Sequence, residues 1–162
     1  MECKSIQDTL QRERKRSDHL NNTITDLSDM HSQMFMAYVN SDLLLYSTVD
    51  AIPIPLYVKN CDFKYELVSK PYCKFHGRSS REFIGRTDYD LYLKEEADIL
   101  TDQDKEVFEK GITLLTPPTS LTDTDGTTHM IQISKTPVID AESRITRLIG
   151  IFQDMTEGKE VR

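Results

Sequence analysis

The sequence predicts an α+β protein in which one long N-terminal helix precedes a domain built on an antiparallel sheet. The stretch from Glu2 to about Val49 contains neither glycine nor proline, and their absence favours a single uninterrupted helix. The rest of the chain reads as two strands, several short helices and three more strands, in that order. This order of elements is typical of an α+β domain with one antiparallel sheet.

The N-terminal helix, residues 1–50, carries a seven-residue repeat of apolar side chains with several polar interruptions. We call the most regular part of this repeat the seam, and its apolar residues are Leu20, Ile24, Leu27, Met34 and Tyr38. A seam on a single helix needs another surface to cover it. We therefore expect a parallel coiled coil that forms a homodimer and relays a signal. The alternative is a single helix that packs back on its own domain.

The globular part begins after Pro53 and Pro55, because two prolines one residue apart cannot continue a helix. We expect strands at 56–59 and 64–69, short helical segments at 71–76, 79–84 and 87–92, an amphipathic helix at 95–110, and strands at 112–122, 127–138 and 147–153. Pro117 and Pro118 interrupt the third strand, which suits an edge or an irregular connection. An Asp-Gly turn at 125–126 joins that strand to the next one.

Composition excludes several classes of protein. The net charge of −7 argues against a general nucleic-acid binder, and we interpret the basic run at 12–16 as a solvated helix face. No stretch approaches the roughly 18–20 apolar residues of a membrane span. Cys3, Cys61 and Cys73 are too few and too scattered for a disulfide framework, which indicates reduced thiols and a cytoplasmic location. We expect no nucleic-acid partner and no membrane contact.

Nothing in the sequence has the pattern of a catalytic or metal site. There is no supported Ser/His/Asp arrangement, no glycine-rich phosphate loop and no cluster of metal ligands. Carboxylates do gather near the start of the amphipathic helix, at Asp88, Asp90, Glu95, Glu96 and Asp98. We place them in a polar turn and a first helical turn, where they complement the helix dipole. The sequence therefore predicts a non-catalytic regulatory domain.

Five phrases of the chain resemble a PAS domain in their order and spacing. They are Leu56–Asn60, Phe83–Tyr92, Asp125–Gly126, Ser134–Val138 and Ile149–Glu157. The resemblance covers residues 51–157 and implies a five-stranded antiparallel sheet with helices covering one face. It also implies a sensory domain of a signalling protein, such as a histidine kinase or a diguanylate cyclase. Residues 158–162 would then begin a linker to an output module C-terminal to this chain.

Departures from the family patterns argue against flavin and against haem as cofactors. Flavin-binding members carry a reactive cysteine where this chain has Asp88, and a glutamine on the last strand where it has Phe152. Haem-binding members supply an axial histidine from the long helix, and residues 94–111 contain none. We interpret His76 and His129 as structural or solvated side chains. No cofactor is predicted, and an unidentified small-molecule ligand is the remaining candidate.

A pocket for such a ligand would lie between the sheet and the short helices. Its expected lining residues are Tyr72, Phe75, Tyr89, Tyr92, Leu100, Ile133 and Phe152. Asp154 and Thr156 match the Asp-x-Thr motif that ends PAS domains, and they would cap the next helix and relay the signal. The sequence thus predicts a cytoplasmic sensory domain of a bacterial-type signalling protein. The alternative is a ligand-free dimerisation and protein-interaction module.

Overall fold

The structure is a computed structural model that describes residues 2–156, with side chains from residue 6 onward. The chain divides into two compact units, Met1–Ser47 and Thr48–Arg162. The second unit is an α+β domain with an antiparallel sheet, so the predicted fold class is confirmed. The expected linker at 158–162 lies outside the described residues.

Helix α1 (Glu2–Ala51) is uninterrupted over 50 residues, as the absence of glycine and proline predicted. It ends immediately before the Pro53 and Pro55 pair. Every residue of the seam is more than half exposed, from 54% for Leu27 to 67% for Met34 and Tyr38. Within the described residues, no helix is both long and apolar enough to cross a membrane.

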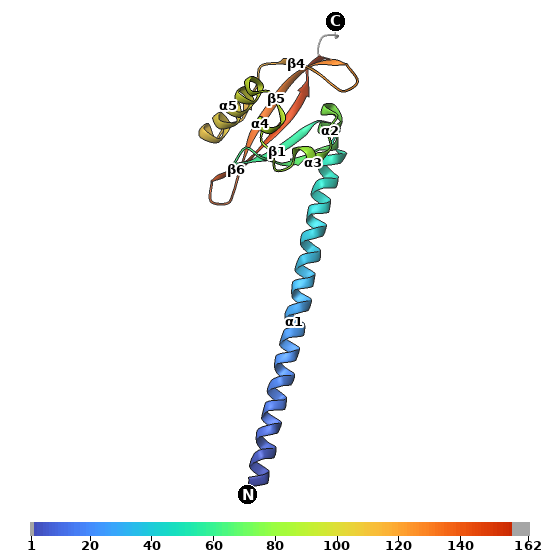
Figure 1. Cartoon of the computed structure of the whole chain (residues 1–162). Helices are drawn as coiled ribbons and strands as arrows, with labels where there is room; N and C mark the ends of the chain where they lie inside the picture. The colour runs from blue at the N-terminus through green and yellow to red at the C-terminus, as the bar shows by residue number, and fades with distance from the viewer. Residues whose placement is uncertain (1, 157–162) are drawn as a thin grey trace. The chain divides into compact units, whose positions relative to one another are not determined.

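The sheet has the order β2-β1-β6-β5-β3, and all pairs of named strands are antiparallel. Its strands are β1 (Leu56–Asn60), β2 (Tyr65–Val68), β3 (Leu114–Leu115), β4 (Thr119–Thr122), β5 (Thr128–Ile139) and β6 (Ile145–Asp154). Strands β1, β4, β5 and β6 are labelled in Figure 1. The expected strand at 112–122 is divided into β3 and β4, which both pair with β5. The division falls at Pro117 and Pro118, because proline has no amide proton for the strand ladder.

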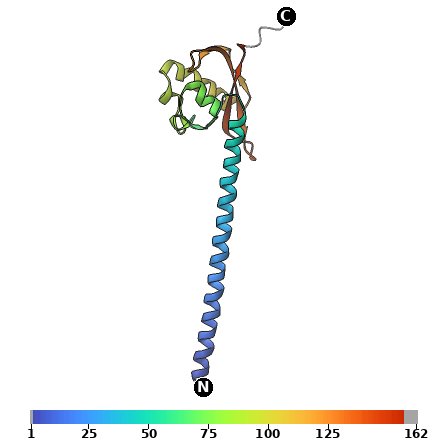
Figure 2. The same cartoon turned by 90° about the vertical axis from the view of Figure 1, so that its right-hand side faces the viewer.

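Four helices follow the first hairpin and lie together on one side of the sheet (Figure 2). They are α2 (Lys70–His76), α3 (Ser80–Phe83), α4 (Asp88–Leu91) and α5 (Lys94–Lys110). Capping residues in the sequence explain where several of these helices begin and end. Capping boxes of Ser79 with Glu82 and of Thr87 with Asp90 begin α3 and α4. Gly111 ends α5 in the left-handed conformation that glycine adopts without a steric penalty.

The core lies between the inner face of the sheet and these helices. Its buried residues are Tyr57, Tyr65, Val68, Tyr72, Phe83, Val107, Ile131, Leu148 and Phe152. Tyr57 on β1 pairs in register with Gly150 on the neighbouring β6. A β-carbon added at Gly150 would overlap the ring of Tyr57, so this glycine makes room for an aromatic side chain on the next strand.

Candidate ligand pocket

A cavity of about 360 Å³ lies between the inner face of the sheet and helices α2 and α5. This volume is within the usual range of small-molecule sites. Aromatic side chains form much of its wall: Tyr57, Tyr65, Tyr72, Phe75, Tyr92 and Phe152. Several rings meet edge to face, for example Tyr72 with Phe152 at 5.4 Å between centroids. Such packing fixes the rings, so the cavity has a defined shape.

The structure brings all but one of the sequence-predicted lining residues to this cavity. Those that line it are Tyr72, Phe75, Tyr92, Leu100, Ile133 and Phe152. Tyr89 does not, and its predicted place is corrected here. Its side chain is half exposed, and its hydroxyl donates to Asp98 at 2.7 Å. Helix α4 is a single turn in which the preceding Asp88 points into the core, so Tyr89 faces outward.

Polar side chains of the cavity wall were missed by the sequence interpretation. They include Lys59, His76, Gln103 and Thr116. A hydroxyl chain runs along the same wall, from Tyr65 to Tyr72 (3.4 Å) and from Tyr72 to Tyr92 (3.5 Å). Burial raises the pKa of Tyr65 and Tyr72 well above the ordinary value, so these hydroxyls stay protonated at neutral pH.

Beneath the cavity lies a cluster of two lysines and two aspartates that we call the tetrad: Lys59, Asp88, Asp104 and Lys135. All four side chains are at most 1% exposed. The Lys59 ammonium donates to Asp88 at 2.5 Å and to Asp104 at 2.7 Å, and Lys135 donates to Asp104 at 2.5 Å. Tyr65 also donates its hydroxyl proton to Asp88, at 2.8 Å. The tetrad joins β1, β5, α4 and α5 through charges that cancel.

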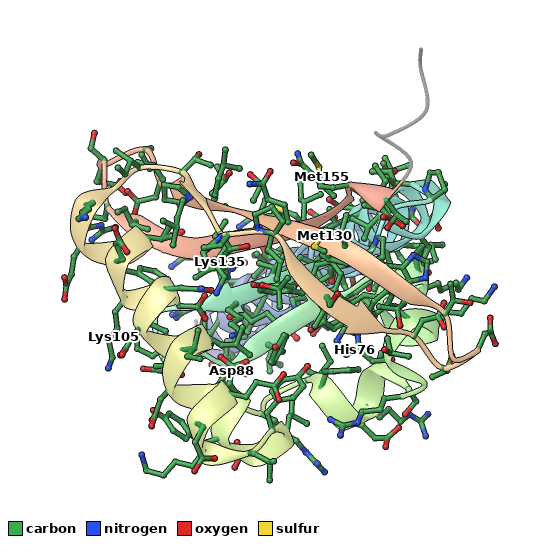
Figure 3. All side chains as sticks on the ribbon, turned by 90° about the horizontal axis from the view of Figure 1, so that it is seen from above. His76, Asp88, Lys105, Met130, Lys135 and Met155 are labelled. Carbon is green, nitrogen blue, oxygen red and sulfur yellow. The ribbon has the colours of Figure 1, made fainter. Side chains whose placement is uncertain are left out.

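Figure 3 shows Asp88 and Lys135 directed into the domain, whereas Lys105 on α5 points outward. Asp88 was expected in a polar turn or a first helical turn, and it is the first residue of α4. Its carboxylate is buried, however, and pairs with Lys59. One signal for the tetrad was present in the sequence. Lys135 occupies the same strand face as Ile131 and Ile133, where a lone lysine is out of place unless it is paired. Desolvation lowers the pKa of this lysine.

The predicted relay residues, Asp154 and Thr156, lie at the end of β6 and form hydrogen bonds with residues of β5. The Asp154 carboxylate accepts from the backbone amide of Thr156 at 2.8 Å, and the Thr156 hydroxyl accepts from the amide of Met130 at 2.9 Å. His129 bridges Asp154 (2.7 Å) and Asp123 (3.0 Å), which lies after β4. Hydrogen bonds to both carboxylates raise the pKa of His129. The strand end, the hairpin turn and β5 are thus joined by one imidazole.

We expect His129→Gln to destabilise the domain most at mildly acid pH. The folded-state pKa of His129 lies above its ordinary value of 6.5, so its stabilising effect is present below 6.5 and is lost as pH rises through the folded pKa. Both carboxylates must also remain charged, which sets the lower limit of the window near their ordinary pKa of 3.8 or below. Urea unfolding of both proteins between pH 5 and 9, roughly the range in which histidine titrates, measures the difference.

Asp123→Asn is the partner control for this prediction, because it removes one of the two carboxylates and should lower the pKa of His129 measured by NMR. A stability difference between wild type and His129→Gln that stays constant or grows with rising pH would contradict the expected bridging by a protonated imidazole.

Comparisons with known proteins agree with this architecture. A family model for the PAS fold matches residues 49–160, which is more than half of the chain. A phage VqmA in complex with DPO shares 23% identity, with a TM-score of 0.61, over 78% of this chain and 57% of that one. The Vibrio cholerae VqmA dimer shares 25% identity, with a TM-score of 0.60, over 72% of this chain and 53% of that one.

One curated sequence, an uncharacterised protein y4lL of Sinorhizobium fredii, is 32% identical over 82 residues, which are 51% of this chain and 10% of that protein. The chain therefore spans only about half the length of the VqmA structures and a tenth of the curated relative. The matched family model, the strand order and the helices on one face of the sheet lead to one conclusion: the chain belongs to the PAS family.

Proposed function

We propose that this chain is a sensory domain that binds a small molecule in the aromatic cavity and passes the signal through its terminal segments. The observation that carries the proposal is the cavity itself. It combines a volume of about 360 Å³ with rigid aromatic walls and a few polar groups, which is the usual composition of a small-molecule site. The complex of phage VqmA with DPO supports the proposal by likeness of fold.

Native mass spectrometry of the purified chain tests this proposal. We expect additional mass that is lost on denaturation, because a bound small molecule stays in the folded cavity. Leu100→Trp should abolish the additional mass by filling the cavity, whereas Leu115→Trp, at an exposed position outside the cavity, should retain it. A bare protein mass for the wild type would favour the alternative, a ligand-free dimerisation module.

We propose that the domain works as a homodimer joined through α1. The seam supports this proposal because five large apolar side chains lie exposed at heptad spacing. The Vibrio cholerae relative is a dimer, which adds support by likeness. An output segment beyond this chain would receive the signal near Asp154 and Thr156. We infer a regulatory rather than catalytic role.

The double variant Ile24→Lys/Leu27→Lys should convert the dimer to a monomer, because two charges per helix would enter the apolar seam. Analytical ultracentrifugation measures the change in mass. Asn22→Lys/Thr25→Lys is the matched control, since it adds the same charge at outer heptad positions and should leave the dimer intact. An unchanged dimer in the seam variant would show that α1 is not the dimer contact.

We propose no particular type of output module for this sensory domain. The expectation that this protein has no nucleic-acid partner finds no support in the comparisons, because the Vibrio cholerae relative has a target DNA. The acidic charge of −7 belongs to this chain alone and does not describe an output module. We propose a cytoplasmic location, which the free thiols of Cys61 and Cys73 support.

A further inference from the structure

A second groove, with a volume of about 300 Å³, lies at the end of β6 and contains His129. The imidazole of this residue lies between two carboxylates, with Nδ1 2.7 Å from Asp154 and Nε2 3.0 Å from Asp123. We call these three side chains the latch. Asp123 lies in the turn between β4 and β5, so the latch joins this turn to the end of β6.

Both contacts of the imidazole require a protonated ring. An ionised carboxylate can only accept, so each ring nitrogen must donate a proton to form its hydrogen bond. The imidazolium has two N–H groups, whereas either tautomer of the neutral ring has one. In the neutral ring, one nitrogen would direct its lone pair at a carboxylate oxygen no more than 3.0 Å away. The turn and the strand end are therefore fully linked only while His129 is charged.

The two carboxylates of the latch are held in place and kept charged by other hydrogen bonds. Asp123 accepts from two backbone amides of its own turn, each at 2.9 Å, and Asp154 accepts from the amide of Thr156 at 2.8 Å. The hydrogen bond from His129 lowers the pKa of Asp123, and the hydrogen bonds from Thr156 lower the pKa of Asp154. Of the three groups, only the imidazole therefore changes its charge near neutral pH.

The other charged groups of the groove come from α2 and from the turn. Among the described residues that line it, Lys74 on α2 disfavours a charged imidazole, and Asp125 in the turn favours one. Phe75, also on α2, packs against the ring with 5.7 Å between centroids. Hydrogen bonds to Asp123 and Asp154 raise the pKa of His129 above 6.5. The change of charge is thus expected above pH 6.5.

Few bonds hold the chain to β5 beyond the latch. The Met155 amide donates to the carbonyl of Met130 at 2.8 Å, and the Met130 amide donates to the hydroxyl of Thr156 at 2.9 Å. Both methionine side chains, labelled in Figure 3, are partly exposed, at 40% for Met130 and 46% for Met155. Loss of one contact of the latch therefore removes a large share of what fixes this strand end.

From this geometry we propose that the latch is a proton-operated switch, which the imidazolium of His129 closes and the neutral imidazole opens. The signal is a change in proton concentration, and a rise in pH releases the end of β6 from the turn. The inference goes beyond the proposed ligand site, because the latch responds to protons without a molecule in the aromatic cavity. The native mass spectrometry of the cavity and the test of the latch can therefore fail separately.

An NMR titration of the whole chain between about pH 5 and 9 tests this switch. The ring nitrogens of His129 report its protonation, and the methyl groups of Met155 and Thr156 report the strand end. We expect a ring midpoint above 6.5 and methyl signals that shift with the same midpoint. The methyl order parameter of Thr156 should fall by about a third as the ring loses its proton, which is the difference between a rigid and a flexible group.

Three variants separate the latch from a general effect of pH. In His129→Gln the methyl signals of Met155 should stay constant, near their wild-type positions at high pH, because glutamine does not titrate. Asp154→Asn should lower the ring midpoint by about half a pH unit or more, because it removes one of the two carboxylates. Asp125→Asn, an exposed carboxylate in the same groove, is the matched control and should change the midpoint by less than about a quarter of a unit.

Two results would overturn the inference. A wild-type ring midpoint at or below 6.5, or one that Asp154→Asn leaves unchanged, would show that the carboxylates do not share a protonated ring. If the ring titrates as expected and the methyl signals of Met155 and Thr156 stay constant, the strand end does not respond and the switch is wrong. The wild type alone gives the midpoint and the methyl response, so the inference can fail even if a variant does not fold.

Discussion

Asp104→Asn is expected to lower the free energy of unfolding by about 3–5 kcal/mol, because it breaks a buried ion pair by removing one partner. Asp104 is fully buried and accepts from both lysines of the tetrad, Lys59 at 2.7 Å and Lys135 at 2.5 Å. The variant leaves two buried ammonium groups with the single carboxylate of Asp88. The geometry of α5 would remain, since asparagine has almost the same shape.

Urea unfolding monitored by circular dichroism measures this effect. Asp102→Asn is the matched control on the same helix, because Asp102 pairs with Lys105 on the surface and its loss should change stability by less than about 1 kcal/mol. A loss of under about 1 kcal/mol for Asp104→Asn would show that the buried charges are compensated elsewhere. In that case the tetrad would not hold α5 against the sheet.

A double-mutant cycle measures the interaction between Asp104 and Lys135. Lys135→Met removes the second ammonium of the tetrad and leaves a side chain of similar length in its place. If the two groups act together, Asp104→Asn and Lys135→Met combined should be less destabilising than the sum of the single variants. Additive losses would mean that the two side chains stabilise the domain independently.

Gly150→Ala is expected to destabilise the domain by about 1–3 kcal/mol, because the new methyl group would overlap the buried ring of Tyr57. Tyr57 is 3% exposed and contacts Tyr65, Tyr72 and Phe152 through its ring. A shift of the Tyr57 ring would therefore disturb its packing against these three rings. The effect is one of overpacking, since the backbone of Gly150 does not have a positive φ. Thermal unfolding of the variant measures the loss.

Tyr57→Leu provides the companion variant for Gly150→Ala. It removes the ring that the new methyl group would meet, so the double variant should be less destabilised than the sum of the two single variants. If Gly150→Ala alone were as stable as the wild type, β1 and β6 would be able to adjust at this position without cost.

The sequence predicted the elements of the domain well where local chemistry decides them. The length of α1 follows from a stretch without glycine or proline, and Gly77 and Gly111 end α2 and α5 as expected. Ile133 on β5 and Phe152 on β6 were expected to line the pocket, and both do so. These features depend on nearest neighbours in the chain, so their pattern can be read before the fold is known.

The candidate site was predicted less completely. Tyr89 was among the aromatic residues expected to line the pocket, yet the single turn of α4 directs it to solvent. Gln103 gave no signal, since a glutamine on a charged helix is ordinary until its oxygen is found buried without a partner. Both cases concern the direction of a side chain, which is fixed only by packing in the folded domain.

Periodicity and capping are local properties, and they were enough to predict the fold class, the order of the elements and the apolar seam of α1. The tetrad, in contrast, could not be predicted before the fold was known. Lys59 and Asp88 are 29 residues apart, and Lys59 and Asp104 are 45 residues apart. No local rule pairs such distant charges, and they meet only when the sheet and helices close over them and exclude the water that would otherwise solvate each one.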